Sequence, residues 1–260
     1  MMNSCKDSII ETLNGSIKVV QYNRPSKKNA TDMNMYVRVT KIFNDAAKDE
    51  DVTVVVLTGA GDYYSSGNDF AVGKTMKSRV DVTRLNTVLK DYIQAFITFP
   101  KSLIAICNGP AIGIAATTLA LCDLVFASEN AFFYTPFTKL GLSAEGCSTF
   151  TFPRLIGQRK AAEMLLYNHK MSANEALDCG FINYIYKPEE IQNKVWDKIV
   201  EISRLPQHSI LTTKNLMKSV FHDELIKTNQ REMAELDNIW SSQKYPNLSK
   251  SAEINEKSKL

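Results

Sequence analysis

The sequence is poor in the residues from which many catalytic and metal sites are built. Its 260 residues include three histidines, at positions 169, 208 and 222, and none has a partner at a spacing typical of metal ligands or catalytic triads. The five cysteines are widely spaced and form no C-x-x-C pair, which indicates free thiols in a reducing compartment rather than disulfides or a zinc site. We therefore expect no metal and no histidine-dependent acyl transfer.

Charge of one sign and long apolar runs are also scarce. The formal net charge is +3, too small for the electrostatic footprint of a nucleic-acid-binding protein. The positive charge gathers in the turn 24–28 and in the last twenty residues. The longest apolar stretch, 103–127, is interrupted by Asn108-Gly109-Pro110 and Asp123, which predicts buried core instead of a membrane span. The first ten residues have no apolar core of the kind found in signal peptides.

Short β-branched runs alternate with segments of helical periodicity through most of the chain. This order predicts an α/β core followed by helices, and we divide the chain into a core, 1–204, and a helical C-terminal region, 205–260. Ser172 and Glu175 have the spacing of a capping box that opens a helix closed by Gly180. The predicted strands are 16–21, 52–57, 102–107, 124–127 and 131–134, and the predicted helices include 31–46, 79–98 and 114–121.

Three familiar signatures are approached and missed. The segment 67–75 has five residues where a phosphate-binding P-loop needs four between its glycines. The segment 59–64 follows a strand as a dinucleotide fingerprint does, but it ends in Tyr64 where the fingerprint needs glycine. The segment 146–150 begins like a nucleophile elbow, but Phe150 replaces its last glycine. None of these sites is predicted.

Glycine is scarce, with 11 residues, yet two loops that follow predicted buried strands contain it. These loops are SSGND, 65–69, and NGPAIG, 108–113. A glycine-bearing turn from a strand to a helix can direct backbone N–H groups into a cavity. Two such groups form an oxyanion hole, which stabilises negative charge on a carbonyl oxygen. Two ordinary strand–helix turns explain the same pattern equally well.

Four segments, in this order, resemble the enoyl-CoA hydratase/isomerase (crotonase) family: NRPSKKNA, SSGNDF, NGPAIGIAATTLALCDLVFAS and MSANEALDCGFINYI. The resemblance is clearest over 17–186 and implies a ClpP/crotonase-like spiral of ββα units with a helical C-terminal region. It also implies that Asn68 and Ile114 provide the two oxyanion N–H groups. The implied substrate-binding residues are Ser66, Gly67, Asn68, Asp69, Phe70, Gly113 and Lys28, with the cations of the turn 24–28 near the phosphates of coenzyme A.

Hydratases of this family use two glutamates, and both are missing here. Their positions match Thr117 and Phe137, neither of which exchanges a proton near neutral pH. One carboxylate remains nearby, Glu145, and it resembles the base of the peroxisomal Δ3,Δ2-enoyl-CoA isomerases. One base on one face of an acyl chain can take a proton from C2 and return it to C4. From the residues alone, an exposed loop glutamate explains Glu145 as well.

The resemblance and the last residues imply a cellular context. The tripeptide Ser258-Lys259-Leu260 is of the kind read by the peroxisomal import receptor, which predicts the peroxisome matrix. The family implies a homotrimer or a dimer of trimers, an acyl-CoA substrate, and no cofactor beyond the coenzyme A of that substrate. Two alternatives stay open: another crotonase reaction, such as weak hydration or thioester hydrolysis, and a non-catalytic acyl-CoA-binding module.

Overall fold

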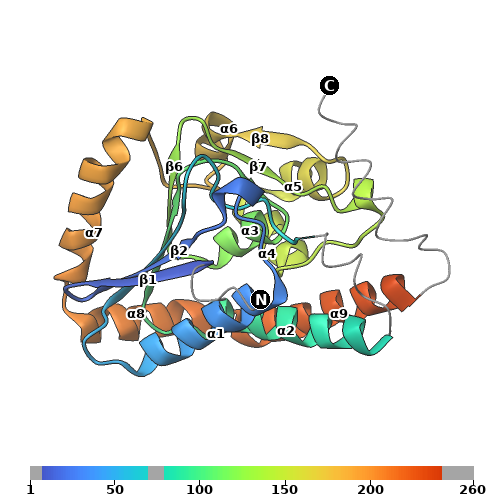
Figure 1. Cartoon of the computed structure of the whole chain (residues 1–260), viewed down its shortest axis with the longest axis horizontal. Coiled ribbons are helices and arrows are strands. Elements are labelled where there is room, and N and C mark those ends of the chain that lie inside the picture. The colour runs from blue at the N-terminus through green and yellow to red at the C-terminus, as the bar shows by residue number, and fades with distance from the viewer. Residues whose placement is uncertain (1–7, 70–78, 242–260) are drawn as a thin grey trace.

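A twisted six-stranded sheet forms the centre of the computed structural model, which describes residues 8–69 and 79–241 (Figure 1). The first two strands are antiparallel, and every later neighbour is parallel. In spatial order the strands are β1 (Ile9–Asn14), β2 (Ile17–Tyr22), β3 (Val54–Gly59), β4 (Ser102–Cys107), β6 (Leu124–Ser128) and β9 (Tyr184–Tyr186). The parallel pairing places the ends of β3 and β4 side by side, and the two glycine-bearing loops follow these ends.

Both faces of the sheet are covered, as the continuous apolar runs of β3 and β4 predict. On one face Val55 and Leu57 belong to the larger core, with side chains from α1 (Met33–Lys48) and α2 (Arg79–Thr98). On the other face Val54 and Val56 pack with residues of α7 (Trp196–Ser203) and of the turn before it. Figure 1 shows α7 alone on one side of the sheet, with α1 and α2 below it.

A small second sheet begins within the second glycine-bearing loop, and four short α-helices follow that loop. Its strands, in spatial order, are β5 (Ala111–Ile112), β7 (Phe132–Tyr134) and β8 (Lys170–Ser172). The helices are α3 (Ile114–Thr117), α4 (Ser148–Leu155), α5 (Gln158–Leu165) and α6 (Ala173–Asp178). The predicted capping box is confirmed: Ser172 accepts the Glu175 N–H, Glu175 accepts the Ser172 N–H, and Gly180 has φ +78° after the helix.

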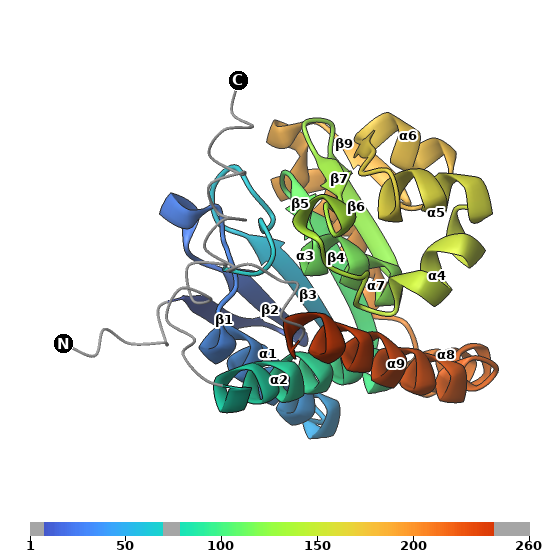
Figure 2. The same cartoon turned by 90° about the vertical axis from the view of Figure 1, so that its right-hand side faces the viewer.

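Two long helices complete the described chain. These are α8 (Gln207–Ser219) and α9 (His222–Ser241), which confirms the helical prediction as far as residue 241. Helix α9 packs along α2, and Figure 2 shows the two side by side at the base of the molecule. The predicted division at residue 204 stays a prediction. Among the described residues, no helix is long and apolar enough to cross a membrane.

The structure differs from the predicted elements mainly at the edges of the fold. Strand β1 was not predicted, because four of its six residues are exposed and its apolar pattern is weak. The helix predicted from Thr31 begins at Met33, since the Asp32 carboxylate accepts the Met35 N–H at 3.0 Å and caps it.

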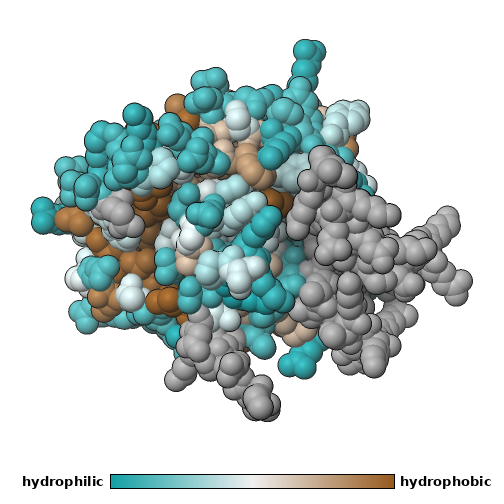
Figure 3. All heavy atoms as spheres, turned by 45° about the horizontal axis from the view of Figure 1, so that its top comes forward, coloured by the Kyte–Doolittle hydropathy of each residue, from teal (hydrophilic) through white to brown (hydrophobic). Residues whose placement is uncertain are grey.

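Figure 3 shows mainly hydrophilic side chains on one face, with an apolar area on the side where α7 lies.

Candidate active site

The first glycine-bearing loop, 65–69, is hydrogen-bonded to the backbone of Thr31. Thr31 donates its N–H to the Gly67 carbonyl at 2.8 Å, and Asp69 donates its N–H to the Thr31 carbonyl at 3.0 Å. Asn68 therefore pairs with Thr31 as a parallel β-bridge in which only its two neighbours make the hydrogen bonds. Because successive residues of an extended segment alternate in direction, the Asn68 N–H points away from Thr31. It is available to a ligand on that side.

The two glycine-bearing loops are in direct contact. Ile112 donates its N–H to the Ser65 carbonyl at 3.0 Å. Gly67 has φ +80°, and a Cβ added to it would lie 2.5 Å from the Ile112 carbonyl oxygen and 3.6 Å from the Gly113 Cα. Only glycine allows this approach. Ile114 is the first residue of α3, so its N–H has no intrahelical acceptor. The fold thus brings the Asn68 and Ile114 loops together.

Glu145 is buried, which contradicts an exposed loop glutamate. The residue is 2% exposed, and neither carboxylate oxygen has a hydrogen-bond partner within residues 8–69 and 79–241. Burial raises the pKa of Glu145 well above its usual value, and the nearby Glu232 carboxylate raises it further. A carboxylate without hydrogen bonds in a desolvated site is a strong base.

The turn after Glu145 packs directly on α3. Gly146 has φ +74°, and a Cβ added to it would lie 2.1 Å from Thr117 Oγ1 and 3.5 Å from Ile114 Cδ1. Thr117 itself is fully buried and donates its hydroxyl to the Ile114 carbonyl at 3.2 Å. Thr117, which the sequence resemblance matches to a hydratase glutamate, is therefore a small side chain that leaves room for the Glu145 turn. Phe137, at the other hydratase position, is buried in the core.

Two residues near this site were not identified from the sequence, Tyr36 and Glu232. Tyr36 lies on α1, is 1% exposed, and donates its hydroxyl to the Asn68 side-chain carbonyl. The charge of Glu145 and the burial of the ring both raise the pKa of Tyr36, with burial the larger cause. Both residues belong to the buried faces of helices. The sequence signal that could have identified them is a polar residue at a position of a helix where an apolar residue is expected.

The other predicted binding residues differ in how free their side chains are. Asp69 forms an ion pair with Arg24 at 2.9 Å, so these two charges fix the loop to the turn. Ser66 donates its N–H to the Lys28 carbonyl at 2.9 Å. Lys28 is exposed, with Nζ 4.9 Å from the centre of the Tyr63 ring. Phe70 lies outside the described residues.

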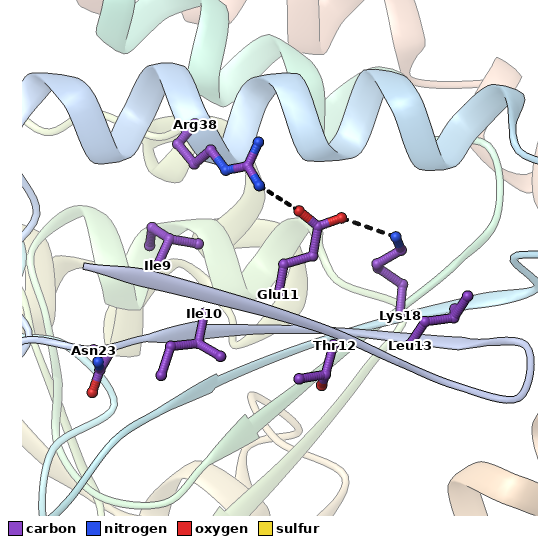
Figure 4. A pocket seen from close by; sticks show the side chains of 8 residues that line it. All are labelled: Ile9, Ile10, Glu11, Thr12, Leu13, Lys18, Asn23 and Arg38. Carbon is purple, nitrogen blue, oxygen red and sulfur yellow. Dashed lines mark hydrogen bonds and ion pairs between the residues drawn. The ribbon is translucent and has the colours of Figure 1, made fainter. Parts of the chain in front are cut away.

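A separate groove lies between β1 and α1, away from these loops. Figure 4 shows Glu11 at its centre, where its carboxylate forms ion pairs with Arg38 at 2.6 Å and Lys18 at 2.9 Å. No predicted site residue lines this groove. Glu11 is thus already paired with two cations of the protein, and we assign no chemistry to this groove.

The predictions about thiols and metals concern residues that the structure describes only in part. Cys107, Cys122, Cys147 and Cys179 are free thiols, as predicted, and Cys5 lies outside the described residues. Within 8–69 and 79–241, no group of three or more His, Cys, Asp or Glu side chains could hold a metal ion.

Comparison with known proteins identifies the relatives of this chain. A family model described as "Enoyl-CoA hydratase/isomerase" matches residues 12–258. The chain is 39% identical over 237 residues to rat "Enoyl-CoA delta isomerase 2", with 90% of this chain and 60% of that protein covered. It is 38% identical over 231 residues to mouse "Enoyl-CoA delta isomerase 3, peroxisomal", with 88% and 72% covered. The chain thus spans about three fifths of the length of the rat relative.

Other similar proteins include a chromodomain protein and solved members of the same family. Human "Testis-specific chromodomain protein Y 1" is 33% identical over 240 residues, which is 91% of this chain and 44% of that protein. Among solved structures, an enoyl-CoA hydratase/isomerase from Pseudoalteromonas atlantica superposes with a TM-score of 0.86 at 25% identity, covering 97% of this chain and 98% of that chain. A putative enoyl-CoA hydratase/isomerase from Acinetobacter baumannii gives 0.80 at 31% identity, covering 91% and 98%. These superpositions confirm the predicted fold class.

Proposed function

The chain belongs to the enoyl-CoA hydratase/isomerase family, and from that premise we propose that it is a Δ3,Δ2-enoyl-CoA isomerase of fatty-acid β-oxidation. The observation that carries the proposal is the environment of Glu145: a buried carboxylate in a turn packed against the start of α3, with no hydrogen bond from any described residue. The names of the rat and mouse relatives support the isomerase reaction.

In the proposed mechanism, the thioester oxygen of a 3-enoyl-CoA accepts hydrogen bonds from the Asn68 and Ile114 N–H groups. The Glu145 carboxylate removes a proton from C2, and the electron pair of that C–H bond delocalises onto the thioester oxygen. The oxyanion hole stabilises this dienolate. Glu145 then returns the proton to C4, the double bond moves to C2–C3, and the base regains its charge. No cofactor beyond the coenzyme A of the substrate is required by these steps.

The replacement Glu145→Gln tests the base. A general base contributes about 10²–10⁴-fold to a rate, so we expect kcat for 3-enoyl to 2-enoyl conversion to fall by at least 10²-fold. The dissociation constant for acyl-CoA should change little, because glutamine keeps the shape of the side chain. Glu129→Gln, which changes an exposed glutamate, is the control. Isomerase activity near that of the unchanged protein in Glu145→Gln would refute the assignment.

Two other functions remain as outcomes of this test. A relative named as a chromodomain protein keeps a non-catalytic acyl-CoA-binding module as the second candidate. Tight acyl-CoA binding without turnover of any enoyl-CoA would support it. A faster rate of 2-enoyl-CoA hydration, or of thioester hydrolysis, than of isomerisation would favour another reaction of the family. The uncharged Thr117 and Phe137 argue against efficient hydration, which needs both an activated water and a proton donor.

We also propose location and assembly. The printed name of the mouse relative supports a peroxisomal matrix enzyme. The tripeptide 258–260 lies outside the described residues, so import through its receptor is tested by the location of a fluorescent fusion with and without it. Exposed apolar side chains at the junction of α8 and α9 support self-association. They are Leu216, Met217, Val220 and Phe221. We propose a homotrimer or a dimer of trimers, and light scattering during gel filtration measures the number of subunits.

A further inference from the structure

Helix α9 has an unusually polar buried face. Thr228, Asn229 and Glu232 are 2%, 1% and 5% exposed, although a helix packed on a core normally buries apolar side chains. A glutamate is rarely buried to this extent unless it is paired. Glu232 comes from a helix that is far from Glu145 in the sequence, and its carboxylate reaches the turn that follows Glu145.

Three hydrogen bonds fix the Glu232 carboxylate to this turn. Oε2 accepts the Cys147 N–H at 2.7 Å, and Oε1 accepts the Thr149 N–H at 3.0 Å and the Thr149 hydroxyl at 2.6 Å. Cys147 precedes α4 in the left-handed conformation, with φ 61°, and its thiol donates to the Leu225 carbonyl of α9 at 3.4 Å. Two side-chain contacts between α9 and the turn therefore hold a backbone conformation that is unfavourable for non-glycine residues.

The same contacts place two carboxylates close enough to influence each other. The charge of Glu232 raises the pKa of Glu145 beyond the effect of burial. Burial raises the pKa of Glu232 to about 7, although its hydrogen bonds to Thr149 and Cys147 and the charge of Arg231 lower it. Tyr36 and Cys147 also face Glu145 electrostatically, and the pKa of each is raised, so both remain neutral. Glu232 is therefore the charged neighbour that acts on Glu145.

We propose that Glu232 is a positioning residue of the active site, which holds the Glu145 turn from α9 and places a second negative charge beside the base. This inference rests on the proposed isomerase function. When Glu145 takes the C2 proton, its charge is neutralised and the repulsion between the two carboxylates ends, so Glu232 favours proton abstraction. Because proton abstraction from carbon is difficult, a stronger base accelerates it.

The replacement Glu232→Gln separates this role from a merely structural one. Removal of the charge lowers the pKa of Glu145, so the acid limb of the kcat/KM profile should move to lower pH by about one unit, which is a tenfold change in the protonation equilibrium. The plateau kcat should fall about threefold, because a Brønsted dependence transmits only part of the loss of basicity to the rate, while KM stays within about twofold. The matched control is Glu235→Gln, which removes a charge from the exposed side of the same helix and should leave the profile unchanged.

A second variant covers the case in which Glu232→Gln does not fold. Thr149→Val removes the hydroxyl whose hydrogen bond most strongly lowers the pKa of Glu232. Glu232 then carries less charge near neutral pH, so the acid limb should move in the same direction by a smaller amount. An acid limb that stays in place in the folded variant, whichever of the two is measured, overturns the proposal.

A readout without turnover separates this inference from the proposed function. Infrared difference spectra against Glu145→Gln report the protonated Glu145 carboxyl as a function of pH. We expect its titration midpoint to be lower in Glu232→Gln than in the unchanged protein. A shifted midpoint in a protein that turns over no enoyl-CoA would refute the function and keep the coupling. Equal midpoints in an active isomerase would refute the coupling and keep the function.

Discussion

The contact between the two glycine-bearing loops leads to a sharp prediction for Gly67→Ala. The new Cβ would lie 2.5 Å from the Ile112 carbonyl oxygen, and ordinary contact begins at 3.4 Å, so the loops must separate by about 3.4 − 2.5 = 0.9 Å. Since a shift of about 1 Å in a catalytic group costs about 10²-fold, we expect kcat to fall roughly 10–100-fold. The φ of +80° adds about 1–2 kcal/mol of backbone strain.

A matched variant separates strain from displacement. Gly180 has φ +78° with nothing within 4 Å of an added Cβ, so Gly180→Ala carries similar strain without a clash. Both variants should lose thermal stability, by about 2–4 °C per kcal/mol for a chain of this size. Only Gly67→Ala should lose isomerase activity, measured as kcat on a 3-enoyl-CoA at saturating substrate. Equal kcat values for the two variants, with both folded, would show that the close approach of the loops does not position the oxyanion hole.

Three further predictions test the neighbourhood of the base. Burial raises the pKa of Glu232 from 4.5 to about 7, so protonated Glu232 stabilises the fold below pH 4.5. About 3 kcal/mol of the free energy of unfolding is then lost as pH rises through 7. Melting curves of Glu232→Gln should show a weaker loss of stability between pH 5 and 8. Tyr36→Phe removes the hydrogen bond to Asn68, so the free energy of unfolding should fall by about 1 kcal/mol in denaturant titrations. The value of kcat should fall several-fold. An unchanged kcat would show that Tyr36 does not position the oxyanion loop. Thr117→Glu should not produce a hydratase but should destabilise the protein by several kcal/mol, because it buries a charge against the Glu145 turn; a stable variant that hydrates 2-enoyl-CoA would contradict this.

Local sequence patterns predicted the elements that carry the site. The predicted strands 52–57 and 102–107 are short and almost wholly β-branched or apolar, which is typical of parallel strands buried on both faces. They match β3 and β4, which lie in the centre of the sheet. Ser172 and Glu175 were predictive because a capping box acts within one turn of a helix. The edge strand β1 was missed, since an exposed strand has no strong apolar alternation.

The candidate site was predicted only where glycine or a family motif marked it. Gly67 stood out because few glycines occur in the chain, and the structure shows what its missing side chain allows. Glu232 and Tyr36 lie in helices whose sequences look like ordinary amphipathic segments. The role of a polar side chain on such a face depends on which loop it meets, and that loop can lie anywhere in the sequence.

The order of the strands, helices and glycine-bearing loops that carry the site follows from the sequence, because period, capping and backbone freedom are local properties. The sequence also shows Thr117 and Phe137 at the two positions that the resemblance matches to hydratase glutamates, and it shows Glu145 nearby. The burial of Glu145 is not, since it arises from α3 on one side and α9 on the other. Desolvation and the field of a second carboxylate act through space, so the basicity of this glutamate was decided by tertiary packing.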